Sequence, residues 1–112
     1  MEPLKIMETR PGNYSLLLNA GSTAVDEVVE ELGHEPNGYF WEGVAQLLVA
    51  TEVSELEGRF AYDPEGGMFV AYGADRPALE QLGAAMSEVA GDADRMRRIV
   101  ALAAERGFEF DD

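Results

Sequence analysis

Carboxylates are the side chains of this sequence with the greatest capacity for chemistry. Its 112 residues include 22 Asp and Glu, eight Lys and Arg, one His and no Cys. A pair such as Glu42 with Asp63 or Glu65 has the residue types for acid–base work of the glycosidase kind. With so many acids, such pairs also arise by chance, and no other catalytic groups converge on them. We therefore expect that the protein is not an enzyme.

Nucleophilic, metal and cofactor sites are not indicated by the other residues. His34 is the single histidine, and none of the serines lies in a Gly-x-Ser-x-Gly turn. No His-x-x-x-His pair is present, the acidic spacings do not match a calcium loop, and the glycines form no phosphate-binding motif. We expect no cofactor and no metal. Because His34 follows Gly33, a helix-ending residue type, we interpret it as an exposed loop residue.

The carboxylates are concentrated in one stretch of the chain. Nine of them lie between Gly21 and Glu57, where there is no Lys or Arg, and the whole chain has a formal net charge of −14. This charge disfavours nucleic acid and anionic membranes as ligands, because both are bound through cationic side chains. It would attract a basic protein partner, and this attraction would mainly raise the association rate. The alternative is that the charge serves only solubility.

The apolar pattern predicts an α+β fold, a single domain over residues 1–112 in which a mainly antiparallel sheet packs with about four helices. Pro11-Gly12 indicates a turn between the first two strands, and Asp63 to Gly67 indicates the turn of a later hairpin. Leu16 to Leu18 is typical of a central strand buried on both faces. Strands are expected at residues 4–7, 14–18, 59–62 and 68–72, with 108–110 as a candidate for one more.

Each of the four helices begins at a recognisable signal. Thr23 and Asp26 resemble a capping box, a turn at residues 35–38 precedes the second helix, and Asp75 and Asp92 are expected caps for the third and fourth. The stripes expected to face the core are Val25, Val28, Val29 and Leu32; Trp41, Val44, Ala45 and Leu48; Leu79, Leu82, Met86 and Val89; and Met96, Ile99, Val100 and Ala103.

Two further features of the helices bear on packing. Gly43 is expected where another backbone comes close, since a glycine inside a helix otherwise weakens it. The four arginines of the last helical segment are expected to pair with nearby acids, including Asp94 with Arg98 four residues on.

The first two helices also carry most of the candidate partner-binding residues. Tyr39 lies at a junction between loop and helix, where an aromatic ring with a polar tip suits a protein interface. Phe40 and Trp41 are interpreted as core anchors instead. The full candidate set is Asp26, Glu27, Glu30, Glu31, Glu35, Tyr39, Glu42, Asp63 and Glu65.

The segment from Gly38 to Ala45, Gly-Tyr-Phe-Trp-Glu-Gly-Val-Ala, together with the hairpin from Phe60 to Phe69, resembles the immunity protein 51 family of bacterial polymorphic toxin systems. The resemblance covers roughly residues 14–106 and leaves out the N-terminal thirteen residues. It implies a cytoplasmic antitoxin that protects its producer by binding and blocking a toxin domain. It implies no inhibitory site at the level of single residues.

Charge and resemblance together favour an immunity protein that binds and neutralises a cognate toxin domain, for instance a basic nuclease whose cationic cleft holds phosphate. The N-terminal residues lack the basic flank and apolar run of a secretory signal, which favours the cytoplasm. One alternative is a small ligand-binding or carboxylate-based enzyme domain, with a pocket lined by Tyr39, Trp41, Glu42 and Tyr62. Another is a homodimerising structural domain with an exposed apolar patch on the third or fourth helix. The choice between monomer and homodimer stays open.

Overall fold

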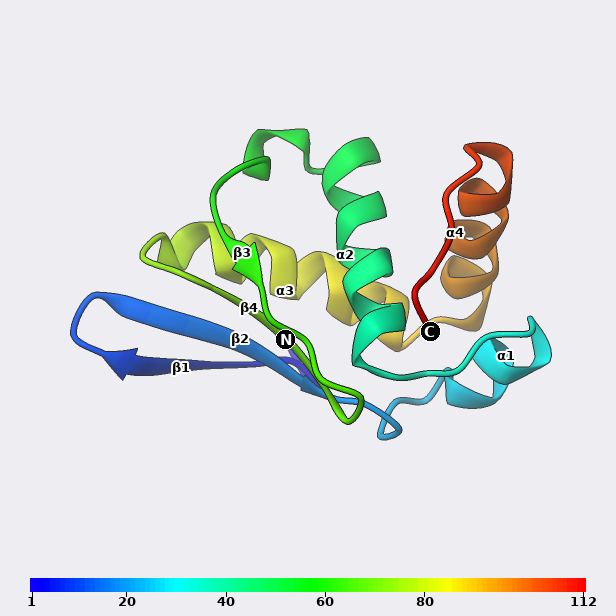
Figure 1. The fold of residues 1–112 in the computed structure, drawn as a ribbon, viewed down its shortest axis with the longest axis horizontal. Helices are drawn as coiled ribbons and strands as arrows, with labels where there is room; N and C mark the ends of the chain where they lie inside the picture. Colours follow the sequence, from blue (N-terminus) through cyan, green and yellow to red (C-terminus); the bar gives the residue numbers. More distant parts are fainter.

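A four-stranded antiparallel sheet forms one layer of the molecule, and helices pack against one of its faces (Figure 1). The computed structural model describes residues 1–112. The strands are β1 Lys5–Arg10, β2 Asn13–Asn19, β3 Ala61–Tyr62 and β4 Met68–Gly73, in the order β1-β2-β4-β3. The predicted N-terminal pair and the predicted hairpin are therefore both confirmed, although β3 is shorter than expected.

The two faces of the sheet differ in their covering. Leu16 and Leu18 of β2 are fully buried beneath α2 and α3, whereas Leu17 between them is only half-buried. The expectation that this strand is buried on both faces is wrong, because the helices cover one face only. Met7 and Tyr72 lie on the open face, each opposite Ser15 in the strand register.

The helices are α1 Asp26–Glu31, α2 Gly38–Thr51, α3 Arg76–Ala90 and α4 Ala93–Glu105, with a 3-10 turn, η1, at Ser54–Leu56. The capping carboxylates of α3 and α4 are confirmed: Asp75 accepts a hydrogen bond from the Ala78 amide at 3.1 Å, and Asp92 accepts one from the Asp94 amide at 2.9 Å. Asn37 caps α2 in the same way, accepting from the Phe40 amide at 2.9 Å.

The start of α1 differs from the expected capping box. Thr23 donates a hydrogen bond to the carboxylate of Asp26 at 2.6 Å, but the helix itself begins at Asp26, with Val25 before it. Thr23 therefore holds the entry turn together without capping the helix.

The core lies between the sheet and the helices and consists of 24 buried apolar residues. Trp41, Phe40 and Phe69 are its largest fully buried side chains. The role expected for Phe40 and Trp41 as core anchors is confirmed. The four apolar positions expected on α3 are all fully buried, whereas Leu32, expected to face the core from the first helix, follows the end of that helix and is exposed.

The C-terminal tail, residues 106–112, runs beside α2 toward the N-terminal end of that helix (Figure 1). The strand expected at residues 108–110 does not form. Instead, Phe110 stacks on Phe40 with ring centroids 4.6 Å apart, and a side chain at Gly43 would collide with the Phe110 ring. The expectation of a close backbone at Gly43 is therefore wrong, since the neighbour is an aromatic side chain.

Candidate partner-binding surface

Three of the four acids of α1 face solvent. Glu27, Glu30 and Glu31 are exposed, and of these only Glu31 has an ion pair, a long one at 3.8 Å to Arg97. Asp26 is different: it is half-buried and accepts the hydrogen bond from Thr23. The first group of candidates thus separates into three solvent-exposed carboxylates, two of them without an ion pair, and one that stabilises the turn before the helix.

A second group of candidates lies around the N-terminal half of α2. Tyr39 is 39% exposed, and Glu42, one turn further along, is half-buried. Burial, and then the negative charge of Asp111 in the tail, raise the pKa of Glu42 above its ordinary value. Glu42 carries a charge that its surroundings disfavour, and no cation in the molecule compensates it.

The β3–β4 hairpin brings Glu65 close to the same end of α2, whereas Asp63 lines a hollow on the open sheet face with Arg10 and Tyr72. The Gly38 amide donates a hydrogen bond to the Gly66 carbonyl at 3.1 Å, and a side chain at Gly38 would collide with the carbonyl of Glu65. Asp63 and Glu65 are both exposed. The backbone of the hairpin therefore packs on the helix end, and its carboxylates remain in solvent.

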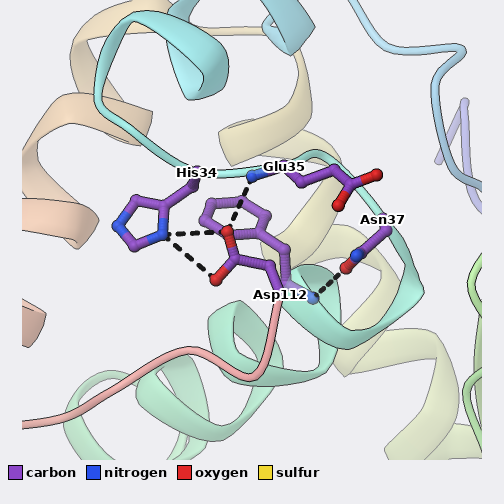
Figure 2. A network of polar contacts seen from close by, with 5 residues as sticks. His34, Glu35, Asn37 and Asp112 are labelled. Carbon is purple, nitrogen blue, oxygen red and sulfur yellow. Dashed lines mark hydrogen bonds and ion pairs between the residues drawn. The ribbon is translucent and has the colours of Figure 1, made fainter.

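The tail adds a contact that the sequence did not indicate. The Asp112 carboxylate accepts a hydrogen bond from the Glu35 amide at 2.7 Å and lies 3.1 Å from Nδ1 of His34 (Figure 2). The His34 ring is 5.5 Å from the ring of Phe40 and 4.9 Å from that of Phe110. His34 is half-buried, so its interpretation as an exposed loop residue is wrong.

This contact enlarges the acidic surface. It places the tail, which contains Glu109, Asp111 and Asp112, against the loop between α1 and α2. Residues more than 70 positions apart meet here, and no local pattern in the sequence predicts such a meeting. The alternation of Phe108 and Phe110 with acids indicated an extended segment but not its docking site.

Of the four arginines expected to pair within the molecule, Arg95 and Arg97 do so, and Arg98 and Arg106 have no ion pair. Arg95 makes two hydrogen bonds to the carboxylate of Glu52, at 2.8 and 3.0 Å, and this contact raises the pKa of the arginine. Arg97 lies 3.5 Å from Asp94, so the expected pair of Asp94 with Arg98 is wrong. Glu52, at the C-terminal end of α2, is thereby neutralised.

The pocket required by the ligand-binding alternative does not have the expected lining. A surface hollow of about 360 Å³ lies between α2, η1 and β3, and Tyr62 is the only one of the four expected residues that lines it. Trp41 is fully buried in the core.

The homodimer alternative required an exposed apolar patch on α3 or α4. No large apolar side chain of these two helices is exposed. The exposed large apolar side chains include Met7 and Tyr72 on the open sheet face.

The fold and its surface define a class of protein: a small α+β domain with an acidic, solvent-facing surface. The chain belongs to the Immunity protein 51 family, whose model matches residues 4–105. The match begins ahead of β1, so the N-terminal strand is part of the family domain, contrary to the expectation that it lies outside. A search of curated proteins and a search of solved structures each found no match.

Membership of this family supports an immunity or antitoxin role, in which the chain binds a cognate toxin protein and acts as an inhibitor rather than as an enzyme. None of the helices is long and apolar enough to cross a membrane.

Proposed function

We propose that the chain neutralises a basic toxin domain, of the nuclease type, by binding it through the acidic surface formed by α1, the N-terminal half of α2 and the tail. The observation that carries this proposal is the set of exposed carboxylates without ion pairs on that surface, among them Glu27, Glu30 and Glu35. A nuclease must hold phosphate in a cationic cleft, and carboxylates are the protein groups that can occupy such a cleft.

The acids of α1 and the residues of α2 contribute to binding at different stages. The carboxylates of α1 are solvated, so they act at a distance and steer the toxin before contact. Tyr39 and Glu42 lie on a longer, packed helix and are partly shielded from water, so they act in the bound complex. Glu65 extends this contact region at the hairpin turn.

Co-expression with the cognate toxin domain tests the proposal. Toxin alone should arrest growth, the chain should restore growth, and the two proteins should purify together in low salt. A toxin domain that stays active and unbound in the presence of the purified chain would overturn the proposal. A complex with an acidic toxin domain would overturn its electrostatic part and leave the immunity role intact.

A further inference from the structure

Besides its exposed acids, the molecule has a hollow on its surface next to Tyr62. It lies between the second half of α2, the turn η1 and the strand β3, with a volume of about 360 Å³, near the lower end of the range for ligand sites. Its walls come from three separate parts of the chain. Five of the eight lining residues are apolar or aromatic, namely Val49, Leu56, Phe60, Tyr62 and Phe108, and the other three are Gln46, Glu57 and Gly58.

The aromatic rings in this wall are held in place by one another. Phe60 and Tyr62 meet edge to face with centroids 5.7 Å apart, and Tyr62 packs in turn on the buried Phe69 at 6.1 Å. Phe60, Tyr62 and Phe108 are each half-buried, so part of each side chain remains accessible from solvent. A guanidinium group binds favourably over such ring faces.

One carboxylate lines this hollow and a second lies near Tyr62 in its wall, and neither has a cation. Glu57 lines it, and Glu42 is close enough that its charge, with that of Glu57, adds to burial in raising the pKa of the Tyr62 hydroxyl. Neither carboxylate makes an ion pair or a side-chain hydrogen bond in the molecule. The basic residue nearest to them in the sequence, Arg59, is engaged with Asp75 at 2.7 Å.

We propose that this groove, an aromatic hollow flanked by Glu57 and Glu42, receives an arginine side chain of the toxin domain. The rings cover the stem and one face of the guanidinium, and the carboxylates accept its N–H groups. Arginine fits better than lysine because its planar group stacks on rings and pairs with carboxylates in a fixed fork. The inference rests on the proposed function and adds a second contact place, beyond the acidic surface of α1 and the start of α2, with the chemistry of the partner group that it takes.

The groove and α1 therefore have separable effects on binding. Charges that remain solvated, as on α1, change mainly the association rate, whereas a charge pair shielded at a contact changes mainly the dissociation rate. A variant of the groove should accordingly leave the salt dependence of association almost unchanged while shortening the lifetime of the complex.

The first test uses arginine itself as the probe. Amide chemical shifts of the full chain are followed during titration with N-acetyl-arginine amide, and N-acetyl-citrulline amide serves as the neutral control of the same shape. We expect shifts centred on Tyr62, Glu57 and Phe108 with arginine and none with citrulline. Equal shifts with citrulline, or shifts centred on α1, would overturn the inference.

The second test compares Glu57→Gln with Glu55→Gln. Both residues are exposed, lie in or next to η1 and lack ion pairs, but only Glu57 lines the groove. We expect Glu57→Gln to weaken binding of both N-acetyl-arginine amide and the toxin domain, the latter by about tenfold through faster dissociation, with Glu55→Gln close to wild type.

The outcomes separate the two proposals. Toxin binding that is unchanged by Glu57→Gln overturns the arginine groove and leaves the proposed function standing. Absence of toxin binding by the wild-type chain overturns both.

Discussion

The residues of the Gly-Tyr-Phe-Trp-Glu segment divide into two kinds. Phe40 and Trp41 are fully buried and contribute to the core, and the indole Nε1 of Trp41 has no hydrogen-bond partner there. Tyr39 and Glu42 reach solvent on the same helix. Packing in the core explains why the segment contains Phe40 and Trp41, its most distinctive residues. The residues that contact a partner are therefore expected to be Tyr39 and Glu42.

Glu42 is expected to weaken the fold slightly while serving binding. Its pKa is raised in the folded chain, so the folded state holds the proton more tightly than the unfolded state, and the resulting penalty is present at neutral pH and disappears as pH falls through the raised pKa. Glu42→Gln should therefore stabilise the protein at pH 7, by less than about 1 kcal/mol because the site is partly exposed to water.

Urea unfolding at pH 7 and in acid measures this effect. The gain from Glu42→Gln should shrink as the pH is lowered toward the value at which Glu42 itself becomes protonated. Glu55→Gln, which removes the same charge at an exposed site without hydrogen bonds, is the control and should change little. A loss of stability at pH 7 in Glu42→Gln would contradict this account.

At the scale of elements, the sequence predicted what is encoded locally. The caps Asp75 and Asp92 and the apolar stripe of α3 involve residues a few positions apart, and all of them were predicted. The docking of the tail, the Asp112 contact and the hollow at Tyr62 depend on residues brought together by the fold, so no periodicity indicates them. Of the candidate site, the exposure of the α1 acids was predictable, whereas the groove was not.

The packing of the hairpin on α2 requires glycine at position 38. A side chain there would meet the carbonyl groups of Glu65 and Met68, which belong to backbone and cannot easily move. We expect Gly38→Ala to cost about 1–3 kcal/mol in the free energy of unfolding. Gly66→Ala is a matched control, since a side chain there meets nothing within 4 Å, and it should cost about 0.5 kcal/mol or less. Equal urea midpoints for the two variants would be inconsistent with this packing.

The tail is expected to be held chiefly by Asp112 and Phe110. Asp112→Ala removes the acceptor of the Glu35 amide, so hydrogen exchange at that amide should become faster while global stability changes little. Asp112→Asn keeps an oxygen acceptor and should retain much of the protection. Exchange at Glu35 that is the same in wild type and Asp112→Ala would show that the tail contact does not protect this amide.

At the scale of the whole molecule, charge is distributed unevenly. The first 20 residues, which form β1 and β2, contain two acidic and two basic residues, whereas the stretch from Gly21 to Glu57 contains nine acids and no base. The tail adds three more acids beside the loop between α1 and α2. A basic partner is therefore attracted to the end of the molecule formed by α1, the start of α2 and the tail, and less to the open face of the sheet.

The most direct measurement is the association rate constant with the toxin domain as a function of ionic strength, for three proteins. They are the wild-type chain, the α1 variant with Glu27, Glu30 and Glu31 changed to Gln, and a control with Glu8, Glu88 and Glu105 changed to Gln. The control removes the same charge from exposed positions on β1, α3 and α4.

We predict that the α1 variant associates about tenfold more slowly than wild type at low salt, that the control is slowed much less, and that the three rates converge in high salt. Rates that are independent of salt and equal for all three proteins would contradict the claim that this acidic surface guides the chain to its toxin.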